Sequence, residues 1–337
     1  MADPINYQVE KQDDGLFKVE VDGKLSVLLP DTISSKVCSA GQLPTGFDPA
    51  NLYQSRNHPR GLQLTVFAAS DAVSSLGINW EKVKNRVPLD QISVYASSAM
   101  GQLDSNGSGG LLQAALQGRR TTSKNLPLGL AEMTADFVNA YVLGNVGTTG
   151  ANIGACATFL YNLRQGINDI KSGKYRVAIV GASEAPLTPE VIEGYRKMGA
   201  LAEDEALAKI DRVETKNVNH RHACRPFGDN CGFTLSEGSQ FIILFDDALA
   251  LELGAEIYGS VADVFVNADG FKKSIPGPGV GNYLTVGKAM GLIRSMLGSE
   301  SLQKRFYNLK KIWNESNDKE FPFEIRKSLS NEERNFE

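Results

Sequence analysis

The chain has 337 residues, a formal net charge of −4, and 42% hydrophobic and 22% charged residues. That length is enough for one large domain or two ordinary ones, and the composition is typical of a globular protein. The negative net charge gives no electrostatic basis for binding nucleic acids, and no apolar run is long enough to span a bilayer.

The N-terminal residues 1–57 show no strong hydrophobic period, and their second half contains the glycines and prolines that are typical of a loop. We therefore expect a weakly structured extension. Its first residues are polar and acidic and lack the basic and apolar regions of a signal peptide, so we expect a cytoplasmic protein. Four cysteines in so long a chain do not suggest a disulfide framework.

The middle of the chain alternates between helical and strand patterns. Residues 59–76 carry apolar side chains at helical spacing up to a glycine stop, and residues 91–97 follow the pattern of an apolar strand. A Gly/Ser-rich loop is expected at residues 105–110. A second helix is expected at residues 130–143, ended by Gly144.

The stretch around Cys156 is the most informative part of the sequence. Small residues at 149–155 lead into the cysteine, and apolar residues then recur on one helical face until Gly173. Residues 175–182 form an uninterrupted apolar strand, of the kind that is buried on both faces of a sheet. Strand, helix and strand in this order predict a βαβ unit with Cys156 at the N-terminus of its helix.

Regular elements continue to about residue 297. We expect strands at 240–245 and 256–262, helices at 248–253 and 286–297, and a loop at 277–281. The loop sequence GPGVG lacks the strand and the lysine pattern of a phosphate-binding loop. The composition then changes, because residues 306–337 are rich in Lys, Asn, Glu and Phe and contain neither glycine nor alanine. This segment is either a solvated tail or a stretch that does not belong to the fold.

Cys156 invites two interpretations. At the start of a helix, the helix dipole and the free N–H groups favour a thiolate and can stabilise an oxyanion when that thiolate attacks a carbonyl. The small neighbours Gly154, Ala155 and Ala157 permit a tight turn and leave the sulfur accessible. Alternatively, Cys156 is a small buried residue that fills the junction between strand and helix.

Several motifs around and after Cys156 resemble the β-ketoacyl synthases of the thiolase-like superfamily, from about residue 59 to residue 297. The first block has a small residue before the cysteine, a Ser-Gly before the next strand and a Gly-x-x-Glu-Ala after it: Ala155-Cys156, Ser172-Gly173 and Gly181-Ala182-Ser183-Glu184-Ala185. Further motifs follow in order: Gly194-Tyr195, Gly199-Ala200-Leu201, Arg225-Pro226-Phe227, Gly232-Phe233, Glu237-Gly238 and Gly254-Ala255.

The resemblance implies an α/β fold with the five thiolase-like layers αβαβα, the first half largely present and the second half incomplete. It implies three parts: a weakly structured extension at 1–57, the thiolase-like region at 58–304 and a divergent polar tail at 305–337. By resemblance the protein is an acyltransferase of fatty acid synthesis. It would act as a homodimer that pairs through residues 147–155, without a cofactor or a metal.

The resemblance also assigns roles to individual residues. Cys156 would take an acyl group from an acyl carrier protein thioester, and a malonyl thioester would then lose CO₂ and condense with it. Met100 and Tyr195 would bind substrate, with Met100 in the acyl pocket of the neighbouring subunit. An ordinary loop methionine is an equal alternative for Met100. Glu237 would have a structural role in a buried turn.

The sequence also departs from the family pattern. The opening strand with its glycine-rich turn, the catalytic lysine and the histidine motifs HGT and GHxxGA are absent, and His58, His220 and His222 lack the required context. Paired histidines stabilise the charge that develops during condensation, and losing such a donor typically costs about 2.7–4 kcal/mol. We therefore expect acyl transfer to survive weakly and condensation to be severely impaired. The alternative is a non-catalytic condensing-enzyme-like subunit that pairs with an active partner.

Two other groups of side chains deserve a hypothesis. His220, His222, Cys224 and Cys231 could form a zinc site, although the spacing H-x-H-x-C-x₆-C is not a usual one. Arg119, Arg120 and Lys124 form a basic group that could meet an acidic carrier protein, or that is simply a solvated surface patch.

Overall fold

The computed structural model describes residues 6–22, 34–55, 57–270 and 279–297. The chain divides into two compact units, residues 1–36 and residues 37–337, which we describe separately. The expected tail at 305–337 lies outside the described residues. No helix in the described ranges has the length and apolarity needed to cross a bilayer.

The first unit contains a β-hairpin where we expected weak structure. Strands β1 (Asn6–Lys11) and β2 (Phe17–Asp22) pair antiparallel, from Asn6 opposite Asp22 to Lys11 opposite Phe17. Gly15 in the connecting turn has a φ of +84°, which favours glycine. The sequence has no clear alternation of apolar and polar residues here, because β2 is almost entirely exposed in this unit and has no buried face that would require one.

Residues 37–57 also differ from our expectation, because they belong to the main unit rather than to an extension. Gly41 N–H donates to Leu235 O at 2.8 Å, and Glu237 N–H donates to Gly41 O at 3.0 Å. The segment has the glycines and prolines of a linker. The N–H and C=O groups of Gly41 nevertheless form hydrogen bonds with a segment almost 200 positions away in the sequence. A local sequence pattern cannot indicate so distant a partner.

The main unit is built around a four-stranded sheet with the strand order β4-β3-β5-β6. Strands β4 (Thr149–Gly150) and β5 (Val177–Glu184) run parallel to the central β3 (Ile92–Ser97), and β6 (Gly238–Phe245) runs antiparallel to β5. Every residue of β3 is buried. The strands expected at 91–97, 175–182 and 240–245 are thus confirmed.

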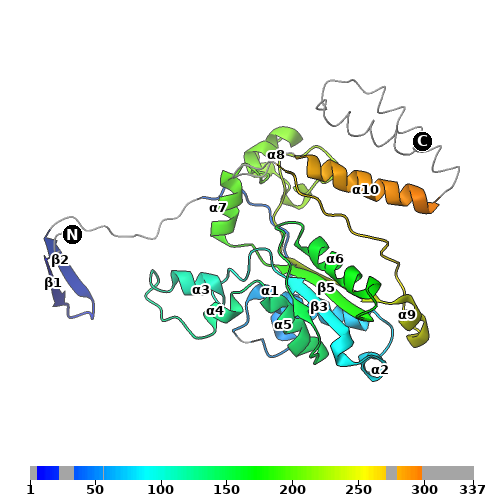
Figure 1. Cartoon of the computed structure of the whole chain (residues 1–337). Helices are drawn as coiled ribbons and strands as arrows, with labels where there is room; N and C mark the ends of the chain where they lie inside the picture. Colours follow the sequence, from blue (N-terminus) through cyan, green and yellow to red (C-terminus); the bar gives the residue numbers. More distant parts are fainter. Residues whose placement is uncertain (1–5, 23–33, 56, 271–278, 298–337) are drawn as a thin grey trace. The chain divides into compact units, whose positions relative to one another are not determined.

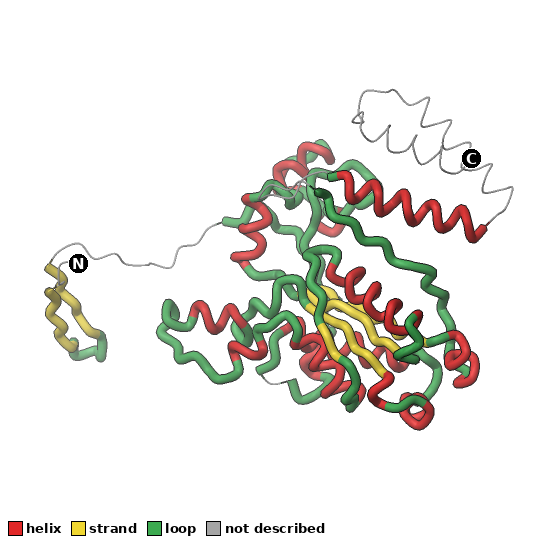
Figure 2. Tube along the Cα trace, in the orientation of Figure 1, coloured by secondary structure: helices red, strands yellow, loops and turns green. Residues whose placement is uncertain are grey.

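Helices cover both faces of this sheet (Figure 1). Helix α6 (Thr158–Lys171) packs on one face, where Leu163 and Ile167 contact Ala178 and Val180. Helices α1 (Arg60–Ser74) and α5 (Met133–Phe137) lie on the other face, with Ala69 and Ala135 in the larger apolar cluster. Figure 2 shows the strands between these helical layers. The expected α/β architecture of the first half is therefore present.

Three expected elements have different bounds or character. The helix expected at 130–143 is α5 followed by a π-helical turn, η3 (Val138–Leu143), and Gly144 ends it with a φ of +58°. The loop expected at 105–110 already contains the start of α3 (Ser108–Gln113). The last helix, α10 (Val280–Leu297), begins earlier than expected and includes Gly281 of the expected loop.

The strand expected at 256–262 is absent, and these residues form a loop. Ile257 and Tyr258 are exposed, and the segment is tied to the end of α1 by Glu256 N–H donating to Leu76 O at 2.9 Å. In the described sheet β6 is an edge strand that pairs only with β5. An apolar alternation is not sufficient for a strand when no neighbouring strand pairs with it.

The remaining elements are short connections around this framework: η1 (Pro49–Asn51), α2 (Trp80–Arg86), η2 (Leu89–Gln91), α4 (Asn125–Leu128), α7 (Pro189–Lys197), α8 (Asp204–Asp211), η4 (Thr215–Asn217), η5 (His220–His222) and α9 (Asp247–Leu253).

A half-buried ion pair joins three distant segments of the main unit. The guanidinium of Arg60, at the start of α1, donates to both oxygens of Glu237, at 3.0 and 3.2 Å, and to Asp48 at 2.7 Å. Glu237 also accepts from Leu43 N–H at 3.1 Å. Burial of the Glu237 carboxyl opposes its ionisation, but Arg60 and Leu43 outweigh that effect and lower its pKa.

Lowering the pH should therefore destabilise the main unit through Glu237. A lowered pKa in the folded state adds stability above the unfolded pKa of about 4.3, and this stability is lost as the pH falls through the folded pKa. Glu237→Gln should lower the free energy of unfolding by about 1–3 kcal/mol at neutral pH. Urea unfolding should find a smaller difference below pH 4. A difference that is the same at both pH values would contradict this role. Glu190→Gln, at an exposed position in α7, is the control.

Candidate active site

Cys156 lies on a sharp turn between β4 and α6. Ala155, immediately before it, has a φ of +48°, a left-handed conformation that is uncommon for a residue with a Cβ. Such a conformation costs of order 1–3 kcal/mol and persists only where the surroundings impose it. The turn thus presents Cys156 two residues before the first residue of α6, at the positive end of the helix dipole.

Thr158 holds this turn in place. Its hydroxyl donates to Ala155 O at 2.7 Å and accepts from Gly154 N–H at 3.0 Å, and the side chain is buried. The tight approach also requires glycine at position 154, because a Cβ there would overlap the ring of Tyr161. The small residues that the sequence places before Cys156 therefore have a steric reason.

A buried amide connects the turn to the sheet. The Asn162 side chain, with none of its surface exposed, donates to Ser97 Oγ at 2.9 Å and to Gly181 O at 3.0 Å. Its oxygen accepts from Asn152 N–H at 3.0 Å, and Ser97 Oγ donates to Asn152 O at 2.6 Å. The segment before Cys156 is thereby fixed to β3 and β5, and an amide in the interior has its hydrogen bonds satisfied.

The thiol of Cys156 is exposed. The alternative of a buried cysteine that fills a junction does not fit this exposure. A cavity of about 330 Å³ opens next to it, and its walls combine the start of α6 with residues that follow β6 in the chain: Ala157, Leu160, Tyr161, Phe265, Val266, Asn267, Asp269, Gly279, Gly281, Asn282, Tyr283 and Thr285. There is thus space for a substrate beside the residue that follows Cys156.

Tyr195 of α7 lies in the same region as Cys156. Burial of its phenol raises the pKa of Tyr195, and the negative charges of Cys156 and Glu184 raise it further. The Tyr195 ring packs edge-on against Phe233, with 5.5 Å between the ring centroids. The sequence predicted three site residues, Met100, Cys156 and Tyr195. Two of them, Cys156 and Tyr195, lie close enough in the structure for the charge of one to affect the pKa of the other.

Glu184, at the end of β5, links Met100 to this group. Its carboxylate accepts from Ala99 N–H, from Ser98 Oγ at 2.9 Å and from the backbone N–H of Met100. Burial raises the pKa of Glu184, although these hydrogen bonds oppose the shift. The loop that carries the partly exposed Met100 is therefore attached to β5 beside Tyr195. Glu184 belongs to the motif Gly181-Ala182-Ser183-Glu184-Ala185, but the motif does not indicate that its carboxylate is partly buried and holds this loop.

The residues of the alternative zinc motif, His220, His222, Cys224 and Cys231, do not come together as a ligand set in the structure. Across the described ranges, the group of His, Cys, Asp and Glu residues with converging ligand atoms is Cys38, Asp204 and His220. His220 is thus the member of this motif that belongs to a cluster, and its partners lie outside the motif. His58 instead lies among aromatic rings, with its Nδ1 3.0 Å from the hydroxyl of Tyr53.

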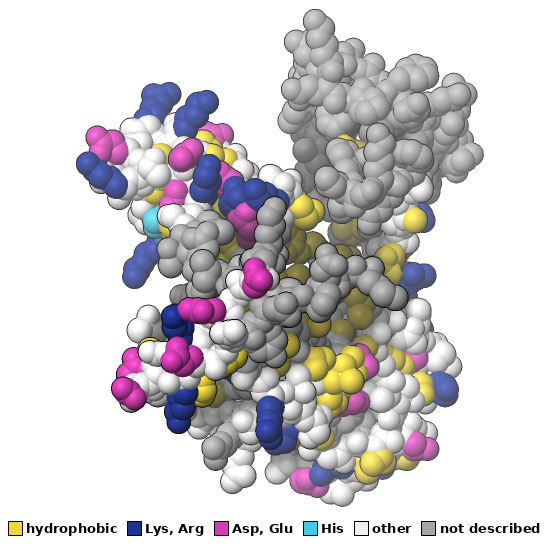
Figure 3. All heavy atoms as spheres, turned by 90° about the vertical axis from the view of Figure 1, so that its left-hand side faces the viewer, with side chains coloured by type: hydrophobic (Ala, Val, Ile, Leu, Met, Phe, Trp, Pro, Cys, Tyr) yellow, Lys and Arg dark blue, Asp and Glu magenta, His cyan; other side chains and the backbone are white. Residues whose placement is uncertain are grey.

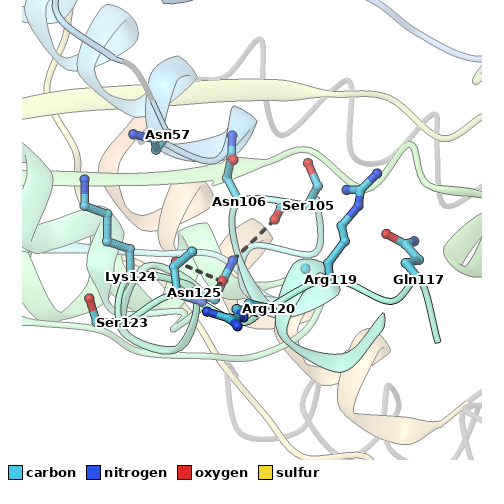
Figure 4. Close-up of a pocket in the computed structure, with 11 residues that line it drawn as sticks. Asn57, Ser105, Asn106, Gln117, Arg119, Arg120, Ser123, Lys124 and Asn125 are labelled. Carbon is cyan, nitrogen blue, oxygen red and sulfur yellow. Dashed lines mark hydrogen bonds between the residues drawn. The ribbon is translucent and has the colours of Figure 1, made fainter. Parts of the chain in front are cut away.

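The basic group forms part of a second cavity, of about 300 Å³. Figure 4 shows Arg119, Arg120 and Lys124 around it, with Asn125 hydrogen-bonded to Ser105 at 3.3 Å. The rest of the lining is polar: Asn57, Asn106, Gly110, Gln117, Thr122 and Ser123. Elsewhere acidic and basic side chains are intermixed over the face shown in Figure 3. The cavity is therefore a local concentration of positive charge on a chain of negative net charge.

Comparisons with known proteins identify relatives of this chain. The family model "Beta-ketoacyl synthase, N-terminal domain" matches residues 35–248. The beta-ketoacyl-[acyl-carrier-protein] synthase FabY of Pseudomonas aeruginosa is 53% identical over 300 residues, which cover 89% of this chain and 47% of FabY. A 3-oxoacyl-[acyl-carrier-protein] synthase 2 of Staphylococcus aureus is 26% identical over 226 residues, or 67% of this chain and 52% of the relative.

Solved structures agree with these sequence matches. The crystal structure of the ketosynthase FabY from P. aeruginosa superposes with a TM-score of 0.78 and 52% identity, over 87% of this chain and 46% of that one. A β-ketoacyl synthase from Burkholderia phymatum STM815 superposes with a TM-score of 0.58 over 70% of this chain and 55% of that one, and at 20% identity it supports the fold alone. The chain spans about half the length of these relatives.

The convergence of Cys156, Glu184 and Tyr195 predicts a measurable shift. Removing the charge of Glu184 or of Cys156 should lower the pKa of Tyr195, because both charges raise it. Glu184→Gln and Cys156→Ser keep the approximate shapes of the side chains. NMR titration of ¹³C-labelled tyrosine, with the Tyr195 signal assigned by Tyr195→Phe, measures the effect. An unchanged Tyr195 titration in both variants would show that the three groups do not meet, and Glu190→Gln should have no effect.

Proposed function

The chain belongs to the β-ketoacyl synthase family, and from that premise we propose that its Cys156 accepts an acyl group from an acyl carrier protein thioester. The observation that carries the proposal is the exposed Cys156 on a strained, hydrogen-bonded turn at the start of α6.

The proposed reaction exchanges one thioester for another. The Cys156 thiolate attacks the acyl carbonyl, the carbonyl oxygen takes the negative charge, and the N–H groups at the start of α6 stabilise it. When the tetrahedral intermediate collapses, the bond to the carrier's sulfur breaks and the carrier leaves as a thiolate. One thioester bond is lost and one is formed, so no other reactant is needed and the step is reversible.

The second stage of the family reaction is the condensation of acyl-Cys156 with a malonyl thioester. We propose that this chain alone performs it poorly. The two histidine motifs that stabilise the enolate charge are not in the sequence. Two of its own three histidines have other partners, since His58 contacts Tyr53 and His220 contacts Asp204 at 3.1 Å. A role in fatty acid synthesis, and a cytoplasmic location that cell fractionation can test, belong to the same proposal.

Incubation with an acyl carrier protein thioester should add one acyl group to the chain. Intact-mass analysis should find a mass gain of one acyl group that is absent in Cys156→Ala. Cys224→Ser is the matched control, because Cys224 is an equally exposed thiol and its loss should leave the mass gain unchanged.

The outcome that contradicts acyl transfer is a folded chain without a mass gain. That result would leave the alternative of a non-catalytic subunit that pairs with an active partner. Condensation is measured separately by adding a malonyl thioester to the acylated chain. We expect little or no β-ketoacyl product.

We further propose that the cavity around Arg119, Arg120 and Lys124 contacts the acidic carrier protein. Three basic side chains line the cavity. Asn125, which also lines it, accepts a hydrogen bond from Thr122 N–H and donates one to Ser105 O, so part of the wall is held in place. Electrostatic attraction at such a patch increases the rate of association and weakens as salt is added.

Charge reversal tests this contact. Arg120→Glu together with Lys124→Glu should lower the second-order rate constant for acylation of Cys156 by carrier thioesters several-fold, and leave the rate constant for a small acyl thioester unchanged. This effect of the charge reversal on the reaction with carrier thioesters should be smaller at high ionic strength, because salt screens the attraction between the charges. Lys209→Glu, an exposed substitution on α8, is the control. Equal effects on carrier-bound and small substrates would argue against docking at this cavity.

Homodimerisation is the last part of the proposal. Strand β4 is a two-residue strand at one edge of the sheet, and it is flanked by Val146, 80% exposed, and Ile153, 55% exposed. A second copy that pairs with β4 would cover these apolar side chains. Sedimentation velocity should detect a dimer that Ile153→Glu weakens and that the control Val213→Glu does not. A monomeric wild-type chain would contradict this.

A further inference from the structure

Three metal-ligand side chains converge away from the candidate active site. Cys38, Asp204 and His220 come from three separate segments, and their ligand atoms all lie within 4.8 Å of one another. His220 Nε2 lies 3.1 Å from Asp204 Oδ2, and Cys38 N–H donates to Asp204 Oδ1 at 3.2 Å. The thiol of Cys38 also hydrogen-bonds the Asp204 side chain. The carboxylate therefore lies at the centre of the cluster, with a thiol on one side and an imidazole on the other.

The backbone holds each of these residues in place. Cys38 is exposed, but its neighbours Val37 and Ser39 are both buried and anchor the segment. Asp204 is the first residue of α8, and its side chain is only 13% exposed. His220 begins the 3₁₀ turn η5, which is capped by Asn219 accepting from Arg221 N–H at 3.2 Å.

A small apolar cluster supports this part of the chain. Leu207 and Ala208 of α8 pack with Val218 and Ala223, the residues on either side of η5. The two segments that carry Asp204 and His220 are thus fixed against each other. A preorganised set of donors binds a metal with little loss of conformational entropy.

We propose that Cys38, Asp204 and His220 bind one Zn²⁺ ion, with water at the fourth position. Thiolate, imidazole and carboxylate are the three side-chain ligands that zinc accepts, and the thiolate disfavours Mg²⁺ and Ca²⁺, which prefer oxygen. Zinc bonds of about 2.0–2.3 Å separate the donors of a tetrahedral site by roughly 3.3–3.8 Å, so side-chain movements of about 1 Å close the site.

Binding exchanges a proton for the metal. The thiol S–H bond breaks, the sulfur bonds to Zn²⁺, and one proton is released to solvent for each ion bound. The ion replaces the hydrogen bonds by which Asp204 now holds Cys38 and His220. Its effect is to fasten the segment at residue 38 to α8 and η5. This site does not depend on the proposed acyl transfer, since it shares no residue with the Cys156 group.

Metal analysis of the full chain tests the proposal. The purified chain is stripped with a chelator, dialysed against micromolar Zn²⁺ and assayed for zinc by mass spectrometry, with the affinity measured by competition with a chromophoric chelator. We expect one ion per chain. Cys38→Ser and His220→Ala should each weaken the affinity by at least about 10–100-fold. The matched controls Cys224→Ser and His222→Ala remove an exposed thiol and an exposed imidazole from the same region and should bind zinc as the wild type does.

Two further readouts separate ligation from misfolding. Co²⁺ in place of Zn²⁺ should produce a thiolate-to-metal charge-transfer absorption that Cys38→Ser abolishes and Cys224→Ser retains. In the unmutated chain, Zn²⁺ should slow the alkylation of Cys38 and not that of Cys224. The proposal is overturned if the chain retains no zinc, if Cys38→Ser and His220→Ala bind it as tightly as the wild type, or if the Cys224 and His222 variants lose it instead.

Discussion

The left-handed backbone conformation of Ala155 is the constraint on which the candidate active site depends. A residue with a Cβ does not keep this conformation by its own preference, and its cost of order 1–3 kcal/mol must be offset by neighbouring contacts. Thr158 supplies two hydrogen bonds to the turn, and Asn162 attaches the preceding segment to β3 and β5. The position of the Cys156 thiol is thus decided by polar side chains inside the protein rather than by the turn alone.

Partly buried carboxylates perform the same task at other places in the main unit. Glu184 accepts hydrogen bonds from the loop that carries Met100, and Glu237 holds Arg60 and the backbone of Leu43. Their environments differ, because burial dominates at Glu184 and raises its pKa, whereas the cation at Arg60 lowers the pKa of Glu237. Both residues position chain segments. Leaving a buried partner of either one unsatisfied costs about 1–3 kcal/mol, which explains why polar groups are retained there.

The two proposed binding regions use different chemistry. Around Arg119, Arg120 and Lys124 the cavity offers positive charge and amides, which suits a large acidic partner that binds and leaves. Around Asp204 the donors are a thiol, an imidazole and a carboxylate, and their ligand atoms lie within 4.8 Å of one another, which suits one small ion. Each region lies beside a short helix of the main unit, α4 in the first case and α8 in the second, where loops bring distant residues together.

Much of the framework could be predicted from the sequence, because hydrophobic periodicity is local. The apolar runs at β3, β5 and β6 and the helical spacing in α1 and α6 report which faces are buried. The same reasoning was wrong at residues 256–262, where an apolar pattern has no neighbouring strand, and it missed the pairing of Gly41 with Ser236. A strand forms only where another strand can pair with it, and the hydrophobic pattern of one segment does not indicate which distant segment that is.

Local sequence patterns were enough to indicate that a cysteine between small residues, at the start of an amphipathic helix, is the candidate nucleophile, and the motifs around it indicated the family. The packing of the whole fold was needed to show that Cys156 is exposed, that Tyr195 feels the charges of both Cys156 and Glu184, that Glu184 holds the backbone of Met100, and that Cys38 meets Asp204 and His220. Spacing along the chain governs contacts within one helix or turn. Contacts between residues that are 85 or 166 positions apart depend on how the sheet and its helices pack, which is a property of the whole fold.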